Sequence, residues 1–198
     1  SQGAGRFAVT LGLDNLIMFY DSTNIQLSTT VEEVTTENVA MKYEAWGWKV
    51  ISINGNDVNE IRKALDEAKA ETQRPTLIIG DTIMGKGAMG ADKSNYENKV
   101  STHGQPLSAA GASIEETIKN LGGDPQNPFS VFPEVAELYA KRAKELEAIV
   151  AERYAAKEAW AKANPELAEK MKFWFSGKAP KLDWEAIEQK ANQATRAA

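Results

Sequence analysis

The sequence predicts an α/β fold, a three-layer doubly wound parallel sheet followed by a helical C-terminal arm. Three short apolar runs, at residues 16–20, 48–53 and 76–80, have the length and composition of buried parallel strands. Segments with apolar residues at helical spacing separate them. Strand, helix, strand, helix, strand is the order expected of a right-handed doubly wound sheet.

The first two helices flank the first strand. A helix is predicted over residues 2–13, already under way at Ser1, and Gly12 interrupts its pattern before the strand at 16–20. A long polar stretch follows, and a second helix then begins after Thr36, which we expect to be its N-cap. Gly47 is the predicted terminator of this helix.

The later helices are marked by capping residues and by proline. Asp57 and Glu60 form a variant capping box ahead of the third helix. A fourth helix is predicted over residues 108–121. Beyond the proline-containing stretch that ends at Pro133, the chain is rich in Ala, Glu and Lys, and further helices are expected, the last starting at Asp183.

Composition excludes several classes of protein. The chain has 198 residues, no cysteine and a net charge of −5, so a disulfide, a thiolate metal site and an electrostatic footprint for nucleic acid are not expected. No apolar run approaches the roughly 20 residues of a membrane span, and no secretory leader is recognisable. The glycines at 85 and 87 do not lead from a strand into a helix, as a dinucleotide-binding Gly-x-Gly-x-x-Gly motif would, which disfavours a nicotinamide dehydrogenase.

The candidate functional residues follow the strands, because ligands of doubly wound sheets bind beyond the carboxyl ends of the strands. His103 is the only histidine, at the end of a loop that opens with Met84-Gly85-Lys86-Gly87. It is suited to proton transfer or to binding an anionic or hydroxylated substrate. A surface or capping histidine is the alternative. Lys86 could contact a phosphate or simply be exposed to solvent.

A second candidate lies directly after the first strand. Asp21-Ser22-Thr23-Asn24-Ile25 gathers oxygen donors, which suit a hard cation such as Mg²⁺. The alternative is an Asx-turn that leaves the strand.

Six separated segments of the chain form a pattern in order and in spacing. The segments are Leu16-Ile17-Met18-Phe19-Tyr20-Asp21, Ile25-Gln26-Leu27, Ala40-Met41-Lys42-Tyr43-Glu44-Ala45-Trp46-Gly47-Trp48, Arg74-Pro75-Thr76-Leu77-Ile78, Met84-Gly85-Lys86-Gly87 and Thr102-His103-Gly104-Gln105-Pro106-Leu107. Together they resemble transketolase, and the resemblance extends over essentially the whole chain. It implies the thiamine diphosphate-binding fold and an enzyme of carbohydrate metabolism that uses thiamine diphosphate and Mg²⁺. The reaction that it implies moves a two-carbon ketol unit between sugar phosphates, and the enzyme that it implies is a cytoplasmic homodimer.

The resemblance also implies roles for individual residues. Thr23 matches the family's metal-binding asparagine, and Ile25 matches the residue whose backbone carbonyl completes the metal site. A threonine hydroxyl is a weaker ligand for Mg²⁺ than an amide oxygen, and Asn24 stands next to it. Met84 matches an apolar position that lines the cofactor. His103 matches the histidine that faces the reactive thiazolium carbon and the substrate hydroxyls.

Two family features are missing from this sequence: the Gly-Asp-Gly motif, whose aspartate binds Mg²⁺, and the pyrimidine-binding domain with its activating glutamate. We therefore expect a fragment of transketolase that is inactive alone. Residues 1–127 would form part of the diphosphate-binding domain, and 128–198 a helical arm leading to the pyrimidine-binding domain. Two alternatives stay open: one chain of a split transketolase-like enzyme, and a non-catalytic interaction module that reuses the fold.

Overall fold

The computed structural model describes residues 2–186. Contacts divide the chain into two units, one up to Ser130 and the other from Val131 onward. Each unit is considered by itself. The predicted domain boundary after residue 127 stays a prediction.

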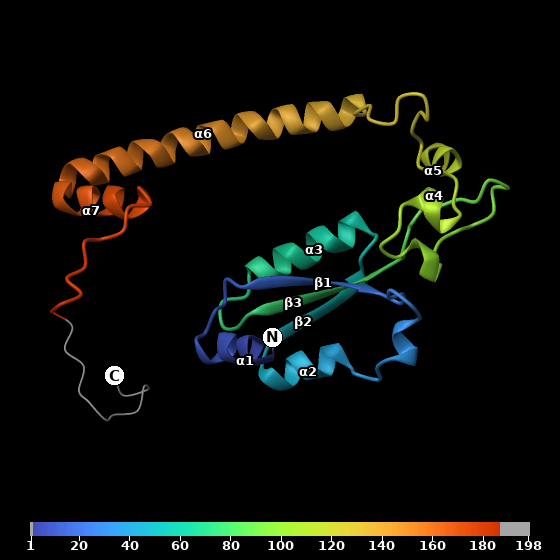
Figure 1. Cartoon of the computed structure of the whole chain (residues 1–198), viewed down its shortest axis with the longest axis horizontal. Helices are drawn as coiled ribbons and strands as arrows, with labels where there is room; N and C mark the ends of the chain where they lie inside the picture. Colours follow the sequence, from blue (N-terminus) through green and yellow to red (C-terminus); the bar gives the residue numbers. More distant parts are fainter. Residues whose placement is uncertain (1, 187–198) are drawn as a thin grey trace. The chain divides into compact units, whose positions relative to one another are not determined.

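The first unit is built on a three-stranded parallel sheet (Figure 1). Its strands are β1 (Ile17–Thr23), β2 (Lys49–Asn54) and β3 (Thr76–Thr82), in the order β1-β3-β2. Ile17 of β1 and Lys49 of β2 both pair with Thr76 of β3. All three strands therefore start at the same level, and their carboxyl ends meet at one edge. The predicted parallel sheet is confirmed.

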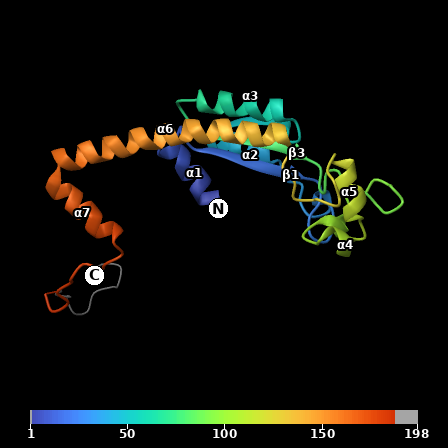
Figure 2. The same cartoon turned by 90° about the horizontal axis from the view of Figure 1, so that it is seen from above.

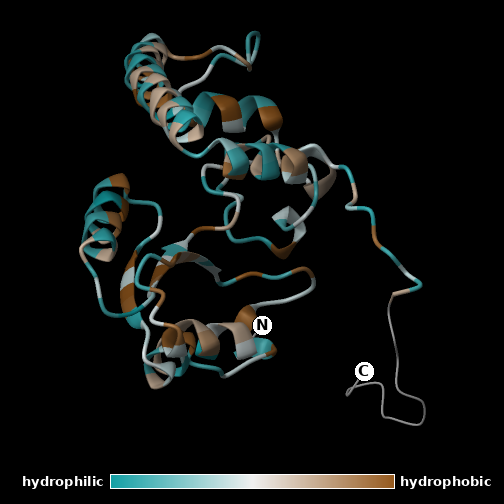
Figure 3. Ribbon diagram, turned by 90° about the vertical axis from the view of Figure 1, so that its left-hand side faces the viewer, coloured by the Kyte–Doolittle hydropathy of each residue, from teal (hydrophilic) through white to brown (hydrophobic). Residues whose placement is uncertain are grey.

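Helices cover both faces of this sheet, as Figure 1 shows. On one face lie α1 (Gln2–Thr10) and α2 (Val39–Trp46), whose side chains enclose a core around Trp48, Leu77 and Ile79. On the other face α3 (Val58–Lys69) packs Ala64 and Ala68 against Ile78. The three layers predicted from the sequence are confirmed, and Figure 3 shows hydrophobic residues along the strands between them.

Several helix ends differ from the prediction. The N-cap of α2 is Asn38, whose side chain accepts a hydrogen bond from the Met41 amide, and not Thr36. Asp57 does cap α3, but Glu60 accepts a hydrogen bond from the Asn54 amide at 2.8 Å, so it ties the helix to β2 instead of closing a capping box. The Glu60 carboxylate thus binds the backbone amide at the end of β2 instead of the amide of the N-cap residue Asp57.

The continuous helix predicted over residues 108–121 is wrong. Two short helices, α4 (Leu107–Ala110) and α5 (Ile114–Asn120), occupy this stretch. Gly111 lies between them in a left-handed conformation with φ 95°, which glycine adopts at low cost. Ser113 then caps α5 by accepting a hydrogen bond from the Glu116 amide. Two 3-10 turns, η1 (Val31–Glu33) and η2 (Val100–Thr102), complete the unit.

The second unit is helical. It contains α6 (Pro133–Ala163) and α7 (Pro165–Phe175), and the chain turns sharply between them at Asn164 (Figure 2). The helical arm is confirmed over this range, whereas most of the helix expected from Asp183 lies outside the described residues. Within residues 2–186, no helix is both long enough and apolar enough to cross a membrane.

Candidate functional site

The carboxyl edge of the sheet carries a polar cavity of about 490 Å³. Because all strands are parallel, the segments that follow β1, β2 and β3 converge there. Amide and carboxylate side chains dominate its wall. The lining residues are Asn24, Asn54, Asn56, Asp57, Val58, Asp81, Thr82, Ile83, Lys86 and Asn98.

The segment after β1 brings two oxygen atoms together. The hydroxyl of Thr23 donates a hydrogen bond to the carbonyl oxygen of Ile25, with the two oxygens 2.9 Å apart. Ile25 is buried, and the Val31 amide donates to the Asn24 carbonyl, which closes the segment into a compact loop. Neighbouring ligands of an octahedral Mg²⁺ with bonds of about 2.1 Å lie about 3 Å apart. The pair therefore fits one edge of such a site, provided the hydrogen bond between them is given up.

The segment after β2 is fixed by its asparagines. The Asn54 side chain accepts a hydrogen bond from the Asn56 amide, and the Asn56 side chain accepts one from the Ile83 amide, both at 3.0 Å. The second bond ties the end of β2 to the chain that leaves β3. Gly55 permits this approach, because a Cβ there would lie 2.8 Å from the carbonyl carbon of Gly80.

The loop after β3 carries the other two predicted site residues. Met84 begins a turn in which Gly85 and Gly87 have positive φ. His103 follows η2 and is half-buried. Its Nδ1 atom is buried and has no hydrogen-bond partner among the described residues. A buried imidazole nitrogen that is left unpaired is available to a ligand.

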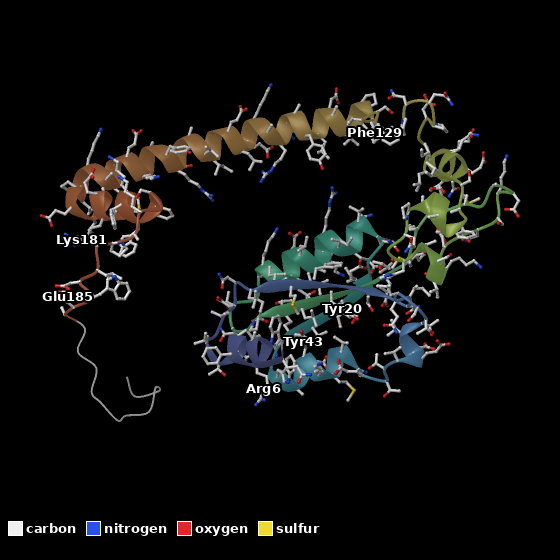
Figure 4. The ribbon with its side chains drawn as sticks, in the orientation of Figure 1. Arg6, Tyr20, Tyr43, Phe129, Lys181 and Glu185 are labelled. Atoms are coloured by element: carbon white, nitrogen blue, oxygen red, sulfur yellow. The ribbon has the colours of Figure 1, made fainter. Side chains whose placement is uncertain are left out.

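The four predicted residues divide into two groups. Thr23 and Ile25 lie together after β1, whereas Met84 and His103 belong to the loop after β3. None of the four lines the polar cavity itself, whose wall is formed by their neighbours. A second cavity, of about 350 Å³, lies between β1 and α2, where Tyr20 and Tyr43 both contribute to the wall (Figure 4).

The cavity wall contains the charged residues Asp57, Asp81 and Lys86, and two further carboxylates, Glu97 and Asp21, lie in the segments that form this edge. Glu97 accepts a hydrogen bond from the Gly87 amide at 2.7 Å, which is the main reason that the pKa of its carboxyl lies below the ordinary 4.5. The Asn95 side chain and the Lys86 charge lower this pKa further. The carboxylate of Asp21, at the end of β1, accepts a hydrogen bond from the Thr82 hydroxyl.

Within residues 2–186, no group of three or more His, Asp or Glu side chains is arranged to hold a metal ion. Thr23 and Ile25 would offer a cation a hydroxyl oxygen and a carbonyl oxygen. Mg²⁺ accepts such ligands when phosphate and water complete its shell. The donor chemistry of Thr23 and Ile25 fits this requirement.

Sequence reasoning identified the strand ends but missed part of the cavity wall. Asn98, which lines the cavity, lies in a polar loop whose sequence carries no recognised motif. The available signal is an asparagine that can adopt a left-handed backbone, and Asn98 does so with φ 53°.

Comparison with known proteins gives one family. Residues 1–180 match the family model described as transketolase, thiamine diphosphate binding domain. The transketolase of Staphylococcus epidermidis is 36% identical over 192 residues, which cover 91% of this chain and 26% of that protein. The transketolase of Streptococcus pyogenes serotype M6 is 34% identical, covering 99% of this chain and 26% of the relative. The chain thus spans about a quarter of the length of the curated relatives that it matches.

Solved structures that resemble this chain belong to the same family. A transketolase of Pichia stipitis in complex with sedoheptulose-7-phosphate superposes with a TM-score of 0.75 at 29% identity, over 90% of this chain and 25% of that one. The transketolase of Campylobacter jejuni gives a TM-score of 0.58 at 36% identity, over 70% of this chain and 21% of that one. The fold predicted from the resemblance is confirmed.

Proposed function

This chain belongs to the family of transketolase thiamine diphosphate-binding domains, and on that premise we propose that it forms the diphosphate-binding side of a site for thiamine diphosphate and Mg²⁺. In the whole protein the reaction is the transfer of a two-carbon ketol unit from a ketose phosphate to an aldose phosphate. The observation that carries the proposal is the pair of oxygens from Thr23 and Ile25, 2.9 Å apart at the carboxyl end of β1.

Thr23 and Ile25 supply two of the metal ligands in this proposal. To bind the metal, the Thr23 hydroxyl turns its proton away from the Ile25 carbonyl, so that both oxygens face the cation. Mg²⁺, when bound here, would take its other ligands from diphosphate oxygens and water and would neutralise diphosphate charge.

His103 and Met84 serve the reactive end of the site. Thiamine diphosphate, when bound, supplies the nucleophilic carbon that ketol transfer requires. Met84 contributes an apolar wall beside it. His103 binds the substrate hydroxyls and moves a proton through its imidazole, and the unpaired Nδ1 supports a role in binding. The homodimer and the cytoplasmic location remain predictions.

We also propose that the 198-residue chain has no transferase activity by itself. It matches about 26% of the length of the curated relatives, and no Gly-Asp-Gly motif occurs in its sequence. A ketol-transfer assay of the purified chain with thiamine diphosphate and Mg²⁺ tests this directly, and calorimetric titration measures whether the chain binds the cofactor at all. We expect no ketol transfer and no binding tighter than millimolar, whereas measurable transfer would overturn the proposal of inactivity.

A chimeric enzyme tests the positive part of the proposal. Residues 1–180 replace the matching segment of the Staphylococcus epidermidis transketolase, and ketol transfer from a ketose phosphate is measured. We expect activity, and a decrease in kcat of about 100-fold or more for His103→Asn, because acid-base groups contribute factors of this size. A folded chimera that is inactive, or a His103→Asn variant that is unaffected, would contradict the assigned role.

A further inference from the structure

The loop after β3 folds back on itself so that residues 84–88 and 96–102 lie beside each other. The Tyr96 amide donates a hydrogen bond to the Ala88 carbonyl at 2.9 Å. At the neighbouring pair of residues, the Gly87 amide donates a hydrogen bond to the Glu97 carboxylate at 2.7 Å. These bonds join the beginning of the loop to the segment that leads into His103.

Asn98 makes the closest connection between the two segments. Its backbone amide donates a hydrogen bond to the carbonyl oxygen of Met84 at 2.9 Å, and its side-chain oxygen accepts one from the Met84 amide at 3.2 Å. Both backbone polar groups of Met84 are therefore bound by one residue. Asn98 achieves this with φ 53°, in the left-handed region that asparagine tolerates better than most residues.

The connection continues from Asn98 to the histidine. Thr102 is buried, and its hydroxyl donates a hydrogen bond to the Lys99 carbonyl at 2.7 Å. Gly85 packs against Thr102 so closely that a Cβ at Gly85 would lie 3.3 Å from the threonine hydroxyl. His103 follows immediately. Residues 98–103 therefore form a short segment with internal hydrogen bonds, and its first residue, Asn98, is hydrogen-bonded to Met84.

We propose that Asn98 is a positioning residue that sets the distance and orientation between Met84 and His103. The inference rests on the function proposed above, in which these two residues serve the same site. His103 has no hydrogen-bond partner at Nδ1 among the described residues, so no bond at that atom orients the ring. The position of the imidazole then depends on its backbone, whose amide donates a hydrogen bond to the Val100 carbonyl at 3.1 Å, and Asn98 ties the start of this segment to Met84.

The expected loss of activity in an Asn98 variant can be estimated from the effect of misplacing a reacting group. A shift of about 1 Å in a reacting group can lower catalysis about 100-fold. Removing one of the two hydrogen bonds to Met84 leaves the other, so we expect a smaller loss of about tenfold.

Two substitutions at Asn98 separate the side-chain hydrogen bond from the backbone conformation. Asn98→Gly removes the side-chain acceptor and adopts the positive φ without strain. Asn98→Asp keeps an acceptor for the Met84 amide and tolerates the same φ. Lys93→Gly is the matched control, since Lys93 also has a positive φ, of 64°, but its side chain makes no contact with Met84 or His103 among the bonds described.

The single histidine provides a readout that does not depend on activity. In the 198-residue chain, the imidazole C–H resonances of His103 are followed by NMR at constant pH. We expect Asn98→Gly to change their chemical shifts, while Asn98→Asp restores the shifts and Lys93→Gly leaves them unchanged. Amide exchange of β3 confirms that each variant is folded.

The chimeric enzyme supplies the second readout. There, Asn98→Gly is expected to lower kcat about tenfold with little change in the stability of the sheet. If Asn98→Gly leaves both the His103 resonances and kcat as in the parent, or if Asn98→Asp fails to restore them, the positioning role is wrong. If the parent chimera is folded but inactive, the proposed function fails instead, and the NMR result still decides whether Asn98 positions His103.

Discussion

The central strand β3 and the long helix α6 are both regular segments, yet their surroundings are opposite. The first five residues of β3, Thr76 to Gly80, are all buried. Within its own unit, α6 has no buried residue among its 31. The strand is therefore stabilised mainly by the side chains packed around it, and the helix mainly by its own sequence.

The sequences of the two segments account for this difference. An uninterrupted apolar run such as Leu77-Ile78-Ile79 has to be covered on both faces, and the helices on either side of the sheet cover it. The helix α6 is rich in Ala, Glu and Lys, which are strong helix formers and need little packing. Its larger apolar residues, such as Leu138 and Tyr139, are exposed. Substitutions should therefore act through packing in β3 and through propensity in α6.

The largest expected effect is in the strand. Ile78 has no exposed surface, so Ile78→Ala should lower the free energy of unfolding of the first unit by about 3 kcal/mol through lost burial and a cavity. Amide exchange of residues 76–82, measured by mass spectrometry, reports this change. The matched substitution Leu138→Ala in α6 should have an effect below about 0.5 kcal/mol. Similar losses at both positions would contradict the comparison.

A smaller effect is expected in the helix. Ala151 is exposed near the middle of α6, so Ala151→Gly should destabilise the helix by about 1 kcal/mol through backbone propensity alone. Circular dichroism and amide exchange should show a local loss of helix in α6 and no change in β3. Ala64→Gly in α3 is the control, because Ala64 is buried against Ile78 and its loss should also weaken the sheet. Equal effects on β3 from both substitutions would show that α6 depends on packing after all.

The smallest effect is electrostatic and lies in the loop after β3. The pKa of Glu97 is lowered, chiefly by the hydrogen bond from the Gly87 amide. A lowered pKa means that the stabilisation is complete above the ordinary value of 4.5 and is lost as the pH falls through the lowered value. The Gly87 amide resonance should therefore shift with pH below 4.5. In Glu97→Gln this dependence should disappear, and a persistent shift there would assign it to another group.

The strands could be predicted from sequence because short apolar runs between helical segments are typical of buried parallel strands. The helix ends could be predicted only in part. Gly47 ends α2 as predicted, with φ 98°, because only glycine adopts this conformation at low cost. Thr36 and Asn38 are both good N-caps by residue type, and in the structure it is the Asn38 side chain that accepts the hydrogen bond from the Met41 amide. Likewise, a sequence pattern does not show that Gly111 breaks a helix whose apolar spacing continues past it.

The candidate site was predictable to a similar degree. The order of strands and helices identified the edge where Asn54, Asn56 and Asp81 converge, and the resemblance pointed to Thr23 and His103. The contacts of Asn98 with Met84 could not be predicted, because they join residues across an irregular loop and depend on one left-handed backbone conformation. Local sequence patterns carry no information about such a contact.

The strand order has a consequence for how the chain folds. Both β1 and β2 pair with β3, and within the described residues they do not pair with each other. Thr76, which begins β3, comes 59 residues after its partner Ile17. Among the described strands, β1 and β2 are therefore both synthesised before β3, the strand that joins them. Forming this part of the sheet depends on contacts between residues far apart in the sequence, and such pairing is intrinsically slow.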